Sequence, residues 1–217
     1  MQNIKNIFEF YQSSGVYNRV ILKEKNKKNL DTLENLRKKT LRLKEFYNKE
    51  DNQLVFADGN NSSKIMIIGD IPGVSDEIHG KPFSGEAGLL LDKMLEAISL
   101  NRKKVYITNI VNFRLPDNKK LEENDIKRFR PLIDEHIKII NPKLILLFGT
   151  STLQAFYEKY SITKVRGKWL KLVIENKSYN CMSSFHPSFL IRQPQQKKDS
   201  WQDLKKLRKK IIENSLC

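Results

Sequence analysis

Four short apolar segments, separated by helical patterns, constrain the fold of this 217-residue chain more than any other feature. They are residues 64–69, 104–109, 143–149 and, more weakly, 179–185. Continuous apolar runs of this length are typical of strands buried on both faces, as in a parallel sheet. Apolar residues recur at helical spacing between them, over 89–98, 126–140 and 153–156. This alternation predicts an α/β fold, a three-layer α/β/α sandwich around a central, mainly parallel four-stranded sheet.

The first quarter of the chain has a different character. Residues 1–50 are strongly charged and carry two helical patterns, over 4–11 and 30–46. A polar segment joins them. We expect a helical N-terminal extension over 1–50 and one compact α/β domain over 51–217, which ends in a basic amphipathic helix over 201–212.

The net charge indicates a polyanionic partner. Forty Lys and Arg residues against 25 Asp and Glu residues leave a net charge of +15. An excess of this size in a globular chain favours nucleic acid, although a lysine-rich surface that only maintains solubility would give the same count. No apolar run reaches the length of a membrane span, and the N-terminus lacks the apolar region of a signal peptide. Two cysteines are too few for a disulfide framework or a four-thiolate metal site. We therefore expect a reduced, cytoplasmic protein with no membrane partner.

Residues with chemical potential follow the predicted strands, whose carboxyl ends are where ligands bind in parallel sheets. Asp70 lies in the tight turn Gly-Asp-Ile-Pro-Gly after the first strand, and the glycine-rich stretch around Phe83 leaves backbone N–H groups open for an anion. Asn109 ends the second strand with an amide that suits a nucleobase edge. His186 follows the fourth strand, with its backbone restricted by Pro187. Taken singly, the asparagine also fits a turn and the histidine a structural role. No nucleotide-binding fingerprint is present, which argues against a nucleotide-dependent enzyme.

The combination of these elements is more specific than any one of them. The order Gly-Asp-x-Pro-Gly, Gly-x-Pro-Phe-x-Gly-x-Ala-Gly, Tyr-Ile-Thr-Asn and His-Pro-Ser-Phe-Leu-x-Arg resembles family 4 of the uracil-DNA glycosylase superfamily over residues 54–206. The resemblance implies a monofunctional repair enzyme that flips deoxyuridine out of DNA and hydrolyses its N-glycosidic bond, releasing uracil and leaving an abasic site. It implies uracil-containing DNA as the partner, and we expect a monomer.

The resemblance also implies roles for individual residues. Asp70 would orient or activate the water, and His186 would hydrogen-bond uracil O2 and stabilise the departing anion. The uracil-binding residues would be Ile71, Asp76, Phe83 and Asn109. Among them Phe83 would stack on the base, and Asn109 would pair with its O4/N3 edge. Asp76 would lie close to the position of a thymine methyl. DNA contacts are implied for Gly85, Ala87, Gly88, Ser188 and Arg192, and the residue that fills the gap in the base stack would lie within 189–192.

Three departures from the family pattern stand out. Asp70 replaces the usual Glu, which sets the carboxylate back by roughly 1.5 Å, about one C–C bond. The four cysteines that hold an iron–sulfur cluster in most members are absent, because two of their positions are Phe113 and Phe129 and no cysteine lies near residues 40–47. We therefore expect no metal and no cofactor. An apolar plug of Phe113 and Phe129, with Phe46 or Leu43, would fill that place. The inserted basic loop of members that trap the uracil site covalently is also missing.

Two alternatives stay open. The first is a related glycosylase with another base preference, such as hypoxanthine or mismatched thymine. The second is a catalytically impaired paralogue that binds DNA lesions, which the Glu-to-Asp change at position 70 supports.

Overall fold

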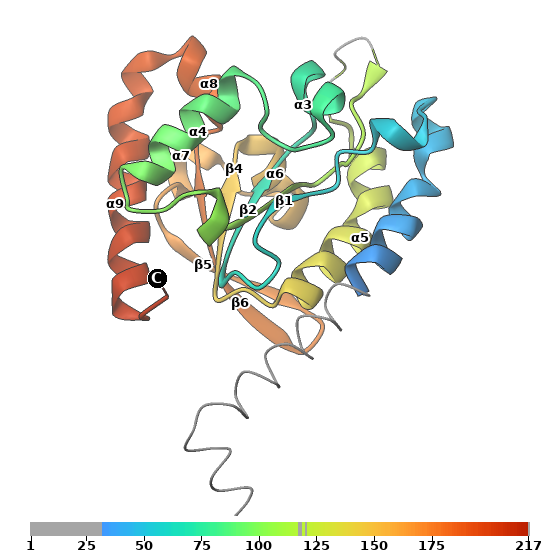
Figure 1. The fold of residues 1–217 in the computed structure, drawn as a ribbon. Coiled ribbons are helices and arrows are strands. Elements are labelled where there is room, and N and C mark those ends of the chain that lie inside the picture. The colour runs from blue at the N-terminus through green and yellow to red at the C-terminus, as the bar shows by residue number, and fades with distance from the viewer. Residues whose placement is uncertain (1–31, 117–118, 120, 217) are drawn as a thin grey trace, which may run out of the picture.

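The computed structural model describes residues 32–116, 119 and 121–216, which fold around a six-stranded sheet (Figure 1). The strand order is β1-β3-β2-β4-β6-β5, and the four central strands are parallel. The two edge strands run antiparallel to their neighbours. The predicted three-layer sandwich is confirmed, whereas the expected number of four strands is wrong. The strand bounds are Asp58–Gly59, Ile65–Gly69, Tyr106–Asn109, Leu144–Phe148, Trp169–Ile174 and Lys177–Ser184 for β1 to β6.

The two strands that were not predicted are both edge strands. β1 has only two residues, too few to produce a pattern. β5 ends with Leu172 and Ile174 buried and Val173 61% exposed between them. Five of its six residues are apolar and only Lys171 interrupts the run, so the sequence did carry a strand signal at this edge. β5 and β6 form a hairpin whose turn contains Glu175, at a φ of +52°.

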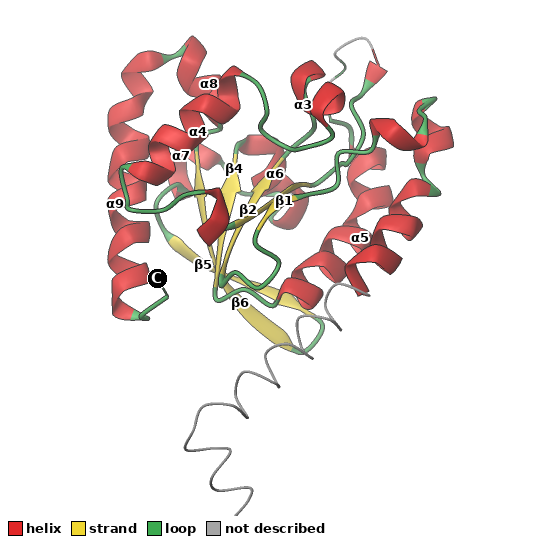
Figure 2. Cartoon of the chain, viewed as in Figure 1, coloured by secondary structure: helices red, strands yellow, loops and turns green. Residues whose placement is uncertain are grey.

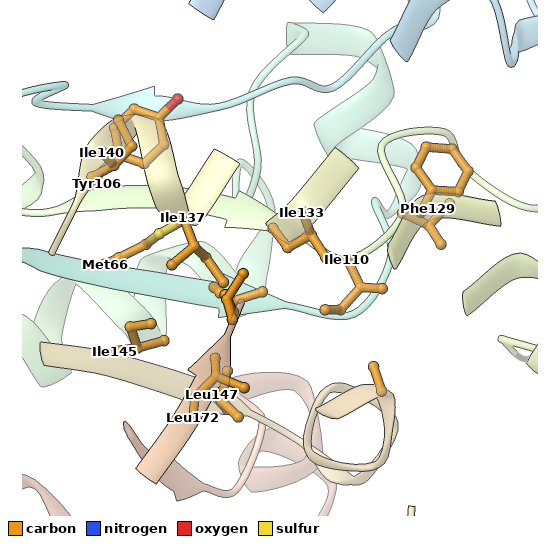
Figure 3. Close-up of a cluster of buried hydrophobic side chains, with 14 of the residues drawn as sticks. Met66, Tyr106, Ile110, Phe129, Ile133, Ile137, Ile140, Ile145, Leu147 and Leu172 are labelled. Atoms are coloured by element: carbon orange, nitrogen blue, oxygen red, sulfur yellow. The ribbon is translucent and has the colours of Figure 1, made fainter. Parts of the chain in front are cut away.

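The central strands separate two buried clusters of side chains. Successive side chains of a strand point to opposite faces. In β2, Ile65 and Ile67 therefore belong to one cluster, and Met66 and Ile68 belong to the other. Both faces of the sheet are buried, which explains why these strands read as unbroken apolar runs. Figure 3 shows part of the cluster that holds Met66.

Helices cover both faces (Figure 2). α5 (Glu123–Ile140) packs on the Met66 side, next to a helical segment over residues 32–41. α4 (Glu86–Glu96) and α9 (Lys197–Glu213) pack on the Ile65 side, with α8 (Pro187–Arg192) beside α4. The remaining helices are α3 (Val74–His79), α6 (Thr150–Phe156), α7 (Ile162–Val165) and the 3-10 turns Lys44–Tyr47, Asp51–Gln53, Arg102–Lys104 and Pro194–Gln196.

The helical patterns between the strands and at the C-terminus are thus confirmed, with bounds shifted by a few residues. The pattern over 4–11 lies outside the described residues. The domain boundary at residue 50 stays a prediction, although Leu33 and Tyr47 pack into the cluster beneath α5. None of the helices that the structure describes is long and apolar enough to cross a membrane.

Aromatic side chains pack where the family resemblance would place an iron–sulfur cluster. The rings of Phe113 and Phe129 are fully buried, with centroids 6.4 Å apart, and Tyr47 contacts both at 6.0 and 5.6 Å. The predicted packing of the two phenylalanines is confirmed. Phe46, in contrast, is 63% exposed beneath the guanidinium of Arg128, and its neighbour Tyr47 takes the inner place.

The donor set at this place does not fit a metal cluster. A phenyl ring offers iron no ligand atom, whereas clusters of this kind are held by thiolates. Within the described ranges, no three His, Cys, Asp or Glu side chains are grouped so as to hold a metal ion. Cys181 is buried in β6, and burial raises the pKa of its thiol to about 12.

Replacing either buried ring should destabilise the fold strongly. We expect Phe113→Ala and Phe129→Ala each to lower the free energy of unfolding by about 3–5 kcal/mol, because each leaves a cavity in a packed cluster. Phe46→Ala is the matched control and should change it by no more than about 1 kcal/mol, the size of an exposed cation–π contact. Urea unfolding of the three variants measures this. Equal effects at buried and exposed positions would contradict the packing.

A buried histidine makes stability depend on pH. His136 of α5 is 2% exposed, with Nε2 2.6 Å from the hydroxyl oxygen of Tyr106 and its ring stacked on Phe56. Burial lowers the pKa of His136 from 6.5 to about 3. Below pH 6.5 this histidine therefore binds a proton in the unfolded chain but not in the folded chain. The free energy of unfolding falls as the pH falls toward 3.

We expect this histidine to account for a loss of about 2 kcal/mol in the free energy of unfolding between pH 7 and pH 5, since 1.5 pH units below 6.5 correspond to roughly that energy. His136→Gln should be less stable at pH 7 but should lose about that much less on acidification. Urea unfolding at the two pH values compares them. The same acid loss in both proteins would argue against a neutral buried imidazole.

Candidate active site

The loops that follow β2, β3 and β6 meet at the carboxyl edge of the sheet and enclose a cavity of about 430 Å³. Both of the predicted catalytic residues line it, as do all four predicted uracil-binding residues and three of the five predicted DNA contacts. These lining residues are Asp70, Ile71, Asp76, Phe83, Gly85, Ala87, Asn109, His186 and Ser188.

Two predicted contacts lie elsewhere. Gly88 is buried in the first turn of α4, where its N–H donates to the carbonyl oxygen of Gly85 at 2.8 Å. Arg192 is exposed at the last residue of α8 and is not part of the lining. The backbone N–H of Gly88 is thus engaged within its own helix rather than directed at the cavity.

Asn109 brings an unpaired amide into the cavity. It ends β3 directly opposite Gly69 of β2 and is 2% exposed. Its Nδ2 has no hydrogen-bond partner in the part of the chain that the structure describes. A buried donor left unpaired costs on the order of 1–3 kcal/mol, so such a group in a cavity indicates a ligand that accepts its hydrogen bond.

The hydrogen bonds of His186 define its tautomer. Nδ1 accepts from the backbone N–H of Ser188 at 3.2 Å and lies 2.7 Å from its hydroxyl oxygen. In the neutral ring the proton must then be on Nε2, which lies 3.6 Å from Oδ1 of Asp70. Burial lowers the pKa of His186, against the opposing effect of the negative charges of Asp70 and Asp76. The imidazole is therefore a neutral hydrogen-bond donor at neutral pH.

Phe83 forms one wall of the cavity. Its ring is 4% exposed and stacks on His186, with centroids 5.3 Å apart and planes inclined by 25°. A ligand that accepted a hydrogen bond from Nε2 would place its acceptor atom near the plane of the imidazole. A planar ligand that also lay in that plane would be nearly parallel to Phe83, which is the arrangement of offset stacking.

The two carboxylates of the site have different surroundings. Asp70 is more exposed, and its Oδ1 accepts from the backbone N–H of Ile71 at 2.9 Å. Asp76 accepts from Gly73 N at 3.0 Å and from Ser84 N at 2.6 Å. It thereby ties the turn after β2 to the loop that carries Phe83, a role that the sequence did not indicate.

Several lining residues were missed by sequence reasoning, including the cations Arg114 and Lys119. Nε of Arg114 donates to Glu77 at 2.9 Å, and Nζ of Lys49 donates to the other oxygen of Glu77 at 2.5 Å. Burial acts to raise the pKa of Glu77, but the two cations outweigh it and lower that pKa. Their basic side chains, five and ten positions after Asn109, were the available signal. The other missed residues are Pro72, Gly73, Val74, Ser75, Glu86 and Leu115.

The fold and the site define a three-layer α/β protein with a cavity, open on one side, that suits a planar, hydrogen-bonding ring. The chain belongs to the uracil DNA glycosylase superfamily, whose family model matches residues 56–205. It is 35% identical over 161 residues to the type-4 uracil-DNA glycosylase of Sulfurisphaera tokodaii, which covers 71% of this chain and 73% of that protein. It is also 36% identical over 146 residues to the type-4 uracil-DNA glycosylase of Thermotoga maritima. That match covers 64% of this chain and 72% of that protein. The family predicted from the strand-end motifs is confirmed.

Gly69 offers a test of how closely the site is packed. A Cβ at this position would lie 2.4 Å from Asn109 Oδ1 and 2.8 Å from Cζ of Phe83, so Gly69→Ala should lower the free energy of unfolding by about 1–3 kcal/mol through overpacking. At Gly73 the nearest atom to such a Cβ is 4.0 Å away, and the backbone suits alanine. Gly73→Ala should therefore change stability by less than about 0.5 kcal/mol. Equal urea unfolding curves for the two variants would refute this packing.

Proposed function

We propose that this chain is a uracil-DNA glycosylase that flips deoxyuridine out of DNA and hydrolyses its N-glycosidic bond, leaving an abasic site. One observation carries the proposal: the unpaired amide of Asn109, the neutral Nε2–H of His186 and the ring of Phe83 line one cavity. These are a pairing edge, a donor for a developing anion and a stacking surface. The names of the type-4 relatives support the same activity.

Asn109 provides the discrimination in this proposal. Its Nδ2–H would donate to uracil O4, and its Oδ1 would accept from N3–H. Cytosine carries an amino group in place of O4, so two donors would face each other and buried groups would remain unpaired. A site built to pair with a substrate group rejects analogues that lack it for this reason.

His186 and Asp70 would carry the chemistry. As the bond between base and sugar breaks, negative charge develops on the uracil and positive charge on the sugar. The Nε2–H of His186 would stabilise the anion through O2, an effect of about 10²-fold or more for a single well-placed donor. Asp70 would orient the attacking water and offset the charge on the sugar. Its partial exposure and its position beside Nε2 support that role.

Asp76 and Ile71 would complete the base pocket, with Asp76 close to the place of a thymine methyl. The hydrogen bonds that Asp76 accepts from two backbone N–H groups support this, because they fix its carboxylate in the wall of the cavity. Arg192, Ser188 and the N-terminal turn of α4 would contact phosphates, and the net charge of +15 fits a polyanion. The proposal includes a monomer that works in the cytoplasm, in the bacterial cytosol or nucleoid where the DNA lies.

The decisive test is excision of uracil from a defined oligonucleotide. Wild-type protein should release uracil, and the strand should break only after alkaline treatment, as expected for hydrolysis without strand cleavage. Breakage before alkali would exclude the monofunctional reaction. An intact strand at excess protein would favour the lesion-binding alternative. Preferential cleavage of hypoxanthine or mismatched thymine would favour another base preference.

Three variants test the assignment of roles. Asn109→Ala and His186→Ala should each lower the single-turnover rate by about 10²-fold or more. His79→Ala is the matched control, because this exposed histidine does not line the cavity and its loss should leave the rate unchanged. Similar rates for all three would refute the site.

A further inference from the structure

Phe83 holds a backbone conformation that needs support from its surroundings. Its φ is +55°, in the left-handed region that residues with a side chain rarely adopt. A conformation of this kind is strained and persists only where neighbouring groups enforce it. The carbonyl groups of Pro82 and Phe83 show where this enforcement comes from.

Both carbonyls accept hydrogen bonds from a single guanidinium. Arg102 lies in the turn Arg102–Lys104 that leads into β3, at the end of that strand opposite Asn109. Its Nη2 donates to the carbonyl oxygen of Phe83 at 2.5 Å, and its Nη1 donates to that of Pro82 at 3.2 Å. Arg102 does not line the cavity, so it holds the Phe83 loop from behind.

The guanidinium is itself anchored from two sides. Nη1 also donates to Asp58 of β1 at 2.9 Å, and Nε donates to Asp92 of α4 at 2.7 Å. All three nitrogens of Arg102 are therefore engaged. Nε and Nη1 donate to carboxylates on separate elements, and Nη1 and Nη2 donate to carbonyl oxygens of the loop. A planar guanidinium presents its donors in a fixed geometry, which a single flexible ammonium group does not.

Gly88 closes the remaining side of the Phe83 carbonyl. A Cβ at Gly88 would lie 1.7 Å from that oxygen and 3.1 Å from Nη2 of Arg102. The oxygen thus lies between the first turn of α4 and the guanidinium. On the far side of the loop, Asp76 accepts from Ser84 N. The loop is held in front and behind, and Phe83 has little freedom to rotate away from the cavity.

We propose that Arg102 is a positioning residue for base recognition, which acts by holding Phe83 in its left-handed conformation so that the ring faces the flipped base. This rests on the proposed function in one respect, namely that Phe83 stacks on the uracil. Arg102 touches neither substrate nor reacting atoms. Its contribution is to make the stacking surface available before the base arrives.

Arg102→Lys separates this role from simple ion pairing. The lysine retains a positive charge between Asp58 and Asp92. Its single ammonium group cannot donate to the carbonyl oxygens of both Pro82 and Phe83 in a fixed geometry. We expect the single-turnover rate of uracil excision to fall by about 10- to 100-fold, the size of effect that small misplacements produce. The midpoint of thermal unfolding should fall little. Arg130→Lys is the matched control, since Arg130 also pairs with a carboxylate and donates to a carbonyl, those of Asp134 and Ala155, away from the cavity. Its rate should stay at the wild-type value.

A double-mutant cycle tests whether Arg102 acts through Phe83. In a Phe83→Leu background the Arg102→Lys change should lower the rate by less than about threefold, because the stacking surface is already altered. An equal loss of rate in both backgrounds would overturn the proposal, and so would a wild-type rate for Arg102→Lys alone.

Amide hydrogen exchange gives a measurement that does not depend on activity. Peptides that cover residues 82–88 should exchange faster in Arg102→Lys than in wild type or Arg130→Lys, because the loop opens more often. Unchanged exchange there would overturn the proposal even in a fully active enzyme. If wild-type protein releases no uracil, the proposed function fails, while faster exchange would still support the hold of Arg102 on the loop.

Discussion

The burial of the central strands on both faces is the constraint on which the rest of the structure depends. In β2, neighbouring residues belong to opposite clusters, so a shift of one residue in the pairing would exchange the two faces. The register is therefore strongly determined, and it aligns Gly69 with Asn109 at the ends of β2 and β3. The loops that follow start from this shared edge, which is why Asn109 and His186, 39 and 116 positions after Asp70, meet it in one cavity. The order of the strands also matters, because β2 lies between β3 and β4 and the chain turns in opposite directions on its two sides.

The parts of the structure that the sequence revealed are those with a local signal. Apolar runs marked the four parallel strands, β6 more weakly than the others, and polar residues at the strand ends marked Asp70, Asn109 and His186. β5 was missed although five of its six residues are apolar, because Lys171 divides the run into two short pieces. The hydrogen bonds of Asp76 to Ser84, and of Arg102 to Phe83, join residues that are 8 and 19 positions apart, and no periodic pattern encodes them. Gly88 appeared as a phosphate contact, whereas the tight approach of Phe83 requires a glycine there.

Apolar packing stabilises the region around Tyr47, Phe113 and Phe129, where the family resemblance would place metal ligands. Tyr47 contacts Phe113 and Phe129 with its ring, while its hydroxyl donates to Asp125 at 2.8 Å and accepts from Arg128 at 3.0 Å. This connects the segment before β1 to α5 through buried apolar area and two polar contacts. Thiolate ligation would connect the same places through bonds that depend on iron supply and oxidation state. Apolar packing depends instead on shape, since rings that interdigitate leave no void and tolerate little change in volume.

The candidate site brings three departures from the usual rules of packing and backbone geometry together in one cavity. Asn109 keeps a buried donor without a partner, the partly buried His186 is kept neutral by its surroundings, and Phe83 holds a left-handed backbone. Each departure lowers the stability of the free protein, and each is sustained by the packed sheet and helices around it. In the proposed function one event would relieve the first two, because a flipped base would accept hydrogen bonds from Asn109 and from Nε2 of His186. The third is not relieved by a ligand, and it therefore needs a permanent restraint. That difference explains why Arg102, Asp76 and Gly88 all converge on the Phe83 loop, whereas nothing in the described structure satisfies the amide of Asn109.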